Sequence, residues 1–280
     1  MAEVSGGTTT RLRTVGRYAV LVALTVVVLL PIYVTVIGSL KPGQTFLDFP
    51  RSLLPVDLTL SVLREAWTVG NLDRYLLNSV IVATLITVGQ VVTSILAAYA
   101  FAFLWMPAKR LLFVVFLATL MVPAEAVILS NVLTIQTWGW IDSYQALVVP
   151  FLATTFGTFL IRQVFMTIPR DLREAAALDG LGHWRFMWDV AVPIGRPAIG
   201  ALALFSFLSA WNQYLWPQRV TNSDRYRTVQ IGLKQLQTAN VDQLNLVMAG
   251  TVLAALPICV LLVVFQRQLV RGLTAGAVKG

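Results

Sequence analysis

Long apolar runs separated by short polar stretches form the pattern of this chain. Leu, Val, Ala and Phe fill the runs without alternating with polar residues at every second position, which predicts helices rather than β-barrel strands. A spanning helix needs about 20 mostly apolar residues, because a rise of about 1.5 Å per residue must cross about 30 Å of hydrocarbon. Six runs are long enough, near Tyr18–Leu40, Tyr75–Leu104, Leu111–Val132, Tyr144–Met166, Ile199–Val220 and Leu244–Phe265. Pro and polar groups interrupt the third and fifth.

Composition agrees with an all-α integral membrane protein. Hydrophobic residues make up 57% of the 280 positions and charged residues 12%, against about 45–50% and about 25% in ordinary soluble domains. Neither a low-complexity segment nor a linker divides the chain. We therefore expect a single transmembrane domain over residues 1–280.

The distribution of Lys and Arg predicts how the chain is oriented. Thirteen of the 21 basic residues fall on the side of the N-terminus, and the acidic residues there number five. Because cytoplasmic loops carry the excess of Lys and Arg, both termini and the loop 166–198 are expected in the cytoplasm. Lipid headgroups account for the basic excess, so no nucleic-acid partner is expected.

The residues that hold metals or carry out catalysis are scarce. Cys259 and His183 are the only cysteine and the only histidine, so neither a thiolate cluster nor a zinc site is expected. No glycine-rich loop followed by Lys and Ser or Thr is present, so no ATP site is expected. We predict that this chain binds no cofactor.

The loop 166–198 reads as two short helices. Pro169 suits the first turn of a helix, and Asp171 and Glu174 complement the positive end of its dipole. Gly180 and Gly182 are expected to take left-handed conformations that end this helix.

A second amphipathic helix follows, in which Trp184, Met187 and Trp188 share one face. Pro193 and Pro197 are expected to interrupt it before the fifth span. One interpretation of the loop is a surface linker in the headgroup layer, with its tryptophans as interfacial anchors. That interpretation explains the tryptophans but not the alanines.

The alanines belong to a longer pattern. Glu174-Ala175-Ala176 is followed by Gly180 and, after nine more residues, by Val190-Ala191-Val192-Pro193. This spacing resembles the permease subunits of ABC importers. The resemblance implies a type I importer permease fold in a bacterial inner membrane, with residues 166–198 as a coupling loop whose short helix docks in a cleft of the ATPase subunit. It places that role on Glu174, Ala175, Ala176, Gly180 and Pro193.

A closer resemblance extends over nearly the whole chain. It is carried by the stretches Thr119–Glu125, Thr158–Pro169 and Trp211–Pro217. These are similar to the second permease of importers for glycerol-3-phosphate and glycerophosphodiesters such as glycerophosphocholine, within the group that includes maltose and trehalose importers. A di- or oligosaccharide substrate therefore remains an alternative.

The same resemblance implies the partners. It predicts a heterodimer with a related permease, an ATPase dimer that uses ATP and Mg, and an extracytoplasmic substrate-binding protein. A membrane-embedded enzyme and a self-sufficient secondary transporter are the other function classes. Neither explains the cytoplasmic alanine pattern, and the spans have almost no His, Asp or Cys.

Polar residues that hydrocarbon should exclude are the candidates for the substrate pathway. Trp211, Asn212, Gln213 and Tyr214 fall in the fifth span. An interfacial aromatic belt explains Tyr214 and Trp216 equally well. The amides of Asn212 and Gln213 favour a cavity or a subunit contact.

Glu125 and Asn78 complete the candidate set. Glu125 follows Pro123, which should kink or break the third span. Three roles are open to Glu125: it binds the hydroxyl groups of a glycerol-like ligand, extends to the membrane surface, or pairs with a basic residue of the partner subunit. A carboxylate is a poor ligand for phosphate, so with a phosphodiester substrate we expect Glu125 beside the choline or glycerol end. Asn78, at the start of the second span, is a weaker candidate.

Overall fold

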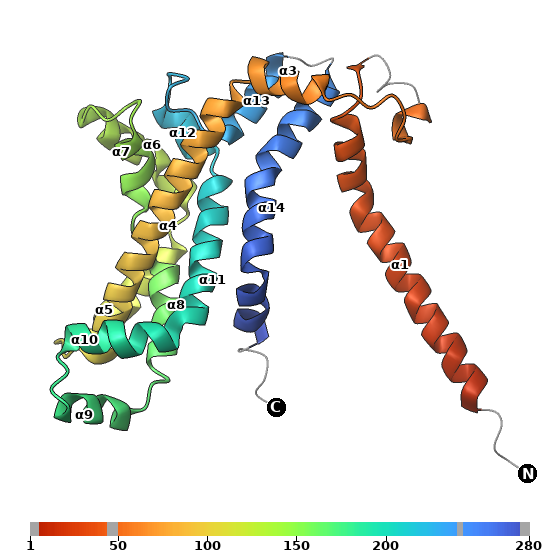
Figure 1. Ribbon diagram of the computed structural model, residues 1–280. Coiled ribbons are helices and arrows are strands. Elements are labelled where there is room, and N and C mark those ends of the chain that lie inside the picture. Colours follow the sequence, from red (N-terminus) through yellow and green to blue (C-terminus); the bar gives the residue numbers. More distant parts are fainter. Residues whose placement is uncertain (1–5, 44–49, 240–242, 275–280) are drawn as a thin grey trace, which may run out of the picture. The chain divides into compact units, whose positions relative to one another are not determined.

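Figure 1 shows a computed structural model of the chain, which describes residues 6–43, 50–239 and 243–274. Within these ranges every regular secondary-structure element is a helix. The elements are α1 (Gly6–Gly38), η1 (Arg51–Leu53), α3 (Ser61–Val69), α4 (Leu72–Phe103), α5 (Lys109–Ala118), η2 (Thr119–Met121), α6 (Ala124–Thr137), α7 (Tyr144–Val148), η3 (Val149–Phe151), α8 (Thr155–Phe165), α9 (Arg170–Leu178), α10 (His183–Phe186), η4 (Met187–Ala191), α11 (Val192–Trp211), α12 (Leu215–Val220), α13 (Val229–Ala239) and α14 (Leu244–Thr274).

The helices supply up to six membrane spans, which confirms the predicted class. Four are single helices that are long and apolar enough to cross a bilayer: Arg13–Gly38, Leu72–Phe103, His183–Trp211 and Leu244–Gln266. Two more are bent pairs, α5–η2 with α6 at 93° and α7–η3 with α8 at 42°. The chain forms two compact units, of which the larger comprises Asp73–Gly232 and Leu256–Gly280. The functional features described below all lie in that unit.

The third span breaks where its proline was expected to break it. Val122 and Pro123 both have extended backbones, with ψ of 114° and 130°. Pro123 has no N–H with which to continue the helical ladder from the preceding turn. A new helix, α6, begins at Ala124.

The fifth span differs from the prediction at both ends. It was expected over Ile199–Val220, but the helix ends at Trp211 and α12 is a separate helix. At the other end, the helix runs continuously from His183, through the π-helical η4, into α11. Pro193 therefore does not interrupt it, because this residue lies in the first turn of α11, directly after the π-helical segment. Pro197 lies inside α11 and does not end it.

An apolar core joins α4, α8 and α11 to residues 166–198, which carry the alanine pattern. Its buried members are Ile95, Ala98, Tyr99, Ile161, Phe165, Ile168, Ala176, Phe186, Met187, Ala191 and Leu202. Gly157 permits a close crossing of these helices, because a Cβ there would lie 2.5 Å from Ser94 Oγ and 2.9 Å from Leu202 Cδ1. The core thus fixes α9 and α10 to one end of α4, opposite the end where α6, α7 and α12 lie (Figure 1).

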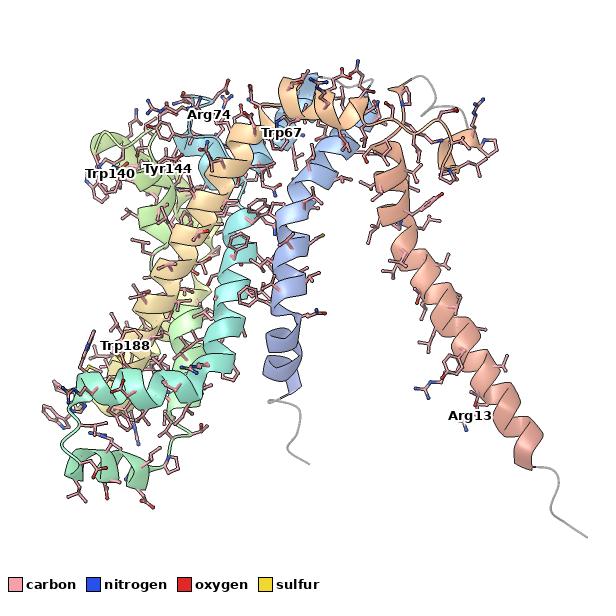
Figure 2. The ribbon with its side chains drawn as sticks, viewed as in Figure 1. Arg13, Trp67, Arg74, Trp140, Tyr144 and Trp188 are labelled. Atoms are coloured by element: carbon pink, nitrogen blue, oxygen red, sulfur yellow. The ribbon has the colours of Figure 1, made fainter. Side chains whose placement is uncertain are left out.

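Side chains of the larger unit mark these two ends (Figure 2). Trp140 and Tyr144 lie at the end of α4 where α7 is found, and Trp188 lies at the α10 end. The rings of Trp184 and Trp188 meet edge to face, with centroids 5.8 Å apart.

Candidate functional site

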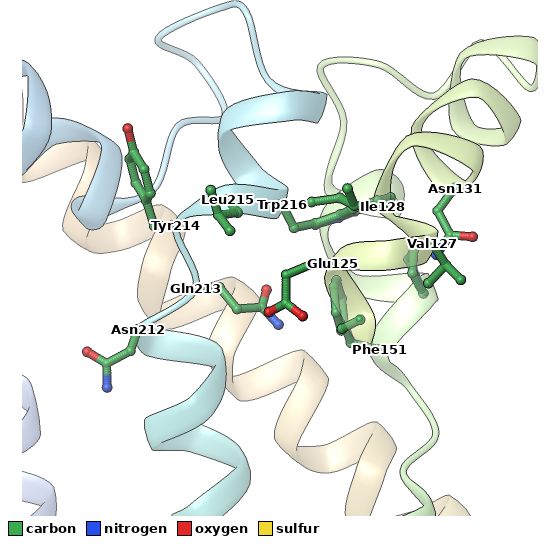
Figure 3. Close-up of a pocket in the computed structure, with 12 residues that line it drawn as sticks. Glu125, Val127, Ile128, Asn131, Phe151, Asn212, Gln213, Tyr214, Leu215 and Trp216 are labelled. Atoms are coloured by element: carbon green, nitrogen blue, oxygen red, sulfur yellow. The ribbon is translucent and has the colours of Figure 1, made fainter. Parts of the chain in front are cut away.

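A pocket of about 420 Å³ lies where three spans lose their helical backbone. Irregular backbone at membrane depth is tolerated where it lines a cavity or is buried in protein, because its polar groups need partners other than lipid. The pocket (Figure 3) is lined by Ala124, Glu125, Val127, Ile128, Asn131, Pro150, Phe151, Asn212, Gln213, Tyr214, Leu215 and Trp216.

Glu125 is the only charged residue among those that line the pocket. It sits in the first turn of α6, directly after the break at Pro123. A carboxylate there complements the positive end of the helix dipole. Its side chain points into the pocket toward Gln213 (Figure 3).

Gln213 lies in the break between α11 and α12. Its backbone N–H donates to the Ala210 carbonyl at 3.3 Å, which closes the last turn of α11. Its side-chain Oε1 is buried and has no hydrogen-bond partner in the part of the chain that the structure describes. An unsatisfied buried acceptor costs about 1–3 kcal/mol, so this oxygen is available to a ligand donor.

The neighbours of Gln213 have different surroundings. The amide of Asn212 donates to the Leu208 carbonyl at 2.8 Å, and its side chain points away from Glu125 (Figure 3). Trp211 is 1% exposed, stacks on Phe207 with ring centroids 5.7 Å apart, and does not line the pocket. Of the four candidates in this stretch, Asn212, Gln213 and Tyr214 line it.

Two aromatic residues form a wall of the pocket. Trp216 Nε1 donates to the Ala146 carbonyl at 2.9 Å, and the Trp216 ring meets the Phe151 ring edge to face at 5.7 Å. From the sequence alone, the role of Trp216 was open, because an interfacial aromatic belt explained this residue as well as a substrate pathway did. Phe151 was missed, because one aromatic residue within an apolar run gives no signal of its own.

Asn78 lies outside the pocket, in a hydrogen-bond network at the end of α4. Its Nδ2 donates to the carbonyls of Arg225 at 3.0 Å and Arg227 at 2.8 Å, while its Oδ1 accepts from Tyr144 Oη at 2.7 Å. The loop between α12 and α13 is also held by Asp142, whose carboxylate accepts from the backbone N–H groups of Asn222 and Ser223 in that loop. Asn78 is buried and fastens the loop between α12 and α13 to α4.

The segment with the alanine pattern folds as α9, a sharp turn and α10. Gly180 has φ of +78°, as expected, but Gly182 has φ of −69° and so is not left-handed. The turn closes through the Leu181 N–H, which donates to the Ala176 carbonyl at 2.9 Å. Left-handed backbone at Gly180 is therefore what ends this short helix.

The two central alanines of α9 face different surroundings. Ala176 is 9% exposed and packs into the core described above. Ala175 and Glu174 are exposed, as are the apolar side chains of Leu172 and Leu178. One face of α9 is thus fixed to the membrane helices and another presents an alanine, a carboxylate and apolar groups.

Trp184 and Met187, which were expected on one face of the second helix, have different surroundings. Met187 is buried in the core, whereas Trp184 is 65% exposed, so the two side chains do not share a face. His183 Nδ1 lies 3.1 Å from Tyr99 Oη, which links the first turn of α10 to α4. His183 thus has a structural partner, and within the described residues no group of three or more His, Cys, Asp or Glu could hold a metal ion.

The family model for the inner membrane component of binding-protein-dependent transport systems matches residues 79–275. Because this match covers well over half of the chain, the protein belongs to that family. It is a permease subunit of an ABC importer, a transport subunit rather than an enzyme, and a multi-pass protein of the inner membrane. An ATPase and a substrate-binding protein are its partners as a member of this class.

Relatives are similar over most of their length. The sn-glycerol-3-phosphate transport system permease protein UgpE of Agrobacterium fabrum is 39% identical over 257 residues, covering 89% of this chain and 91% of the relative. The protein of the same name from Brucella abortus is 38% identical over the same coverage. That from Yersinia pestis is 37% identical over 88% of this chain and 90% of its own.

The fold matches a solved ABC transporter. A chain of the bacterial ABC transporter involved in import of the acidic polysaccharide alginate superposes with a TM-score of 0.82, covering 95% of this chain and 99% of that one. At 20% identity, this match concerns the fold alone. It confirms the predicted type I importer permease architecture.

Proposed function

We propose that this chain is the second permease of an importer for glycerol-3-phosphate or for glycerophosphodiesters such as glycerophosphocholine, and forms half of the translocation pathway. The observation that carries the proposal is the similarity to sn-glycerol-3-phosphate permeases over about nine-tenths of both chains. The other half of the pathway belongs to a related permease, in a heterodimer. Two copies of the ATPase subunit bind ATP and Mg, and this chain binds neither.

The pathway role falls on the pocket residues. Glu125 and Gln213 are its central polar groups, with Asn212 and Tyr214 at the break in the fifth span. Trp211 and Asn78 support the surrounding helices rather than contact the substrate, because both are buried outside the pocket. Both chain termini and the loop 166–198 lie in the cytoplasm, in keeping with the basic excess on that side.

Coupling to ATP hydrolysis falls on α9. Its exposed surface combines Ala175, which allows close approach, with Glu174, which can accept charge-assisted hydrogen bonds from a partner arginine. Leu178, which is 89% exposed, adds apolar area that a cleft would cover. Ala176 and Gly180 fix the position and the end of the helix, and Pro193 lies in the first turn of α11.

A sugar importer is the second candidate function. It is favoured by one observation, that no Lys, Arg or His is among the residues lining the pocket. Aromatic walls with amides and a carboxylate also suit the apolar and hydroxyl faces of a sugar. In that case the substrate is a di- or oligosaccharide such as maltose or trehalose.

Uptake into proteoliposomes tests the proposal. The complete complex, with its binding protein and internal ATP, is supplied separately with labelled glycerol-3-phosphate, glycerophosphocholine, maltose and trehalose. Accumulation of a glycerophosphate compound, and of neither sugar, is expected. Accumulation of a sugar alone would contradict the proposed substrate but not the assignment to ABC importers.

A further inference from the structure

The charge of the pocket limits which end of a phosphorylated substrate it can receive. Its only charged residue is Glu125, and no basic side chain is among the residues that line it. A phosphate placed beside this carboxylate would meet a like charge, and no basic side chain of the lining would offset the repulsion. The pocket therefore suits the part of the ligand that is remote from the phosphate.

Two polar side chains in the lining, Glu125 and Gln213, offer oxygen atoms that accept hydrogen bonds. An ionised carboxylate only accepts, and the buried Oε1 of Gln213 lacks a donor among the described residues. The two side chains come from different spans and point toward each other across the pocket (Figure 3). Two acceptors in this arrangement match a ligand with two neighbouring donors.

Apolar side chains make up most of the remaining lining, which also includes Asn131, Asn212 and Tyr214. Phe151 and Trp216 present aromatic rings, and Val127 and Ile128 present aliphatic side chains. A groove of about 280 Å³ shares Asn131, Pro150 and Trp216 with the pocket, so a longer ligand has room to extend. An apolar cavity with few polar groups is the usual form of a small-molecule site.

We propose that the pocket binds the glycerol end of the substrate through its two vicinal hydroxyl groups, which donate to Glu125 and Gln213. This rests on the proposed function. It assigns the phosphate to groups outside this pocket, and it makes Glu125 and Gln213 the residues that select a free diol. Glycerol-3-phosphate and glycerophosphocholine carry the same diol, so both engage the pocket in the same way.

The test compares the Glu125→Gln complex with wild type in proteoliposome uptake. The substrates are glycerol-3-phosphate, glycerophosphocholine and propyl phosphate, which lacks both hydroxyls. Hydrogen bonds to charged groups contribute about 1.5–3 kcal/mol, so the preference for glycerol-3-phosphate over propyl phosphate should fall roughly tenfold or more. The same binding protein serves both complexes, so its own selectivity cancels in the comparison.

A second variant makes the test independent of the analogue. Gln213→Met keeps the size of the side chain and removes the amide oxygen. It should lower uptake of glycerol-3-phosphate and glycerophosphocholine by a similar factor, about three- to tenfold for one neutral hydrogen bond. Glu65→Gln, the same chemical change in α3, serves as the matched control and should leave uptake at the wild-type value.

Each contrary outcome has a distinct meaning. If Glu125→Gln lowers uptake of glycerophosphocholine only, the carboxylate serves the choline ammonium and the diol assignment is wrong. If it raises uptake of glycerol-3-phosphate, the phosphate lies beside Glu125. Unchanged uptake of both compounds in both variants also overturns the assignment, whereas a wild-type complex that transports neither overturns the proposed function instead.

Discussion

The phenol oxygen of Tyr99 in α4 lies 3.1 Å from Nδ1 of His183, the first residue of α10. The two rings are nearly perpendicular, with centroids 6.1 Å apart, and Tyr99 is buried. This link joins a membrane-spanning helix to the segment that carries the alanine pattern. Together with Ala176 in the shared core, it attaches the α9–α10 segment to the spans on both sides of the Gly180 turn.

Tyr99→Phe should lower the stability of the complex modestly. The change removes the hydroxyl and keeps the ring, so the loss is that of one hydrogen bond, about 0.5–1.5 kcal/mol. Thermal unfolding of the purified complex measures it. In a double-mutant cycle with His183→Phe, the second change should cost little once the first is present. Fully additive losses would show that the two side chains are not coupled.

Gly180→Val should uncouple ATP hydrolysis from uptake. The backbone at Gly180 is left-handed, with φ of +78°, and a β-branched side chain strongly disfavours this conformation. The end of α9 must therefore shift in the variant. The measurement is substrate uptake per ATP hydrolysed, which should fall several-fold. Gly182→Val is the matched control, because Gly182 has φ of −69° and open space around its Cα, and should behave like wild type. Equal effects in the two variants would contradict a specific role for the turn.

Asn78→Leu should destabilise the protein rather than change its substrate affinity. The amide makes three hydrogen bonds, and their loss leaves two backbone carbonyls and a tyrosine hydroxyl without this partner. A loss of about 2–4 kcal/mol is expected for a buried group of this kind. Tyr144→Phe removes only one of the three bonds and should cost less. A higher KM in Asn78→Leu, with unchanged thermal stability, would instead return Asn78 to the substrate pathway.

Gly157→Ala should impair folding of the membrane domain. The added methyl group would lie 2.5 Å from Ser94 Oγ and 2.7 Å from Thr154 Cγ2, so the helices must move apart. Overpacking of this kind costs about 1–3 kcal/mol, which lowers the yield and the Tm of the complex. Gly16→Ala, at a position with nothing within 4 Å, should leave both unchanged. Equal Tm values for the two variants would show that the helices packed around Gly157 can accommodate a methyl group.

The spans could be predicted from the sequence because hydrocarbon imposes a length and a composition on any helix that crosses it. The two ends of the fifth span could not be predicted in this way. Tyr214, Leu215 and Trp216 follow the two amides after Trp211 and extended the predicted span, but the Asn212 amide donates to the Leu208 carbonyl and α11 ends at Trp211. At the other end, Pro193 indicated a stop, yet a π-helical segment places this residue where a missing N–H is harmless.

The polar site residues could be predicted from the sequence because polar side chains are rare in segments that face lipid. Glu125 and Gln213 stand out as polar groups in apolar runs, and both line the pocket. Asn78 gave the same signal, and the structure uses it to fasten a loop. A polar residue in such a run indicates only that it avoids lipid, and the fold decides whether it meets a ligand or a carbonyl.

ATP hydrolysis by the reconstituted complex tests the central claim most directly. The complex and its binding protein are titrated with glycerol-3-phosphate, with glycerophosphocholine, and with maltose and trehalose. Stimulation by a glycerophosphate compound alone, abolished in a complex that lacks this chain, is the predicted result. Stimulation by a sugar with no response to either glycerophosphate compound would contradict it.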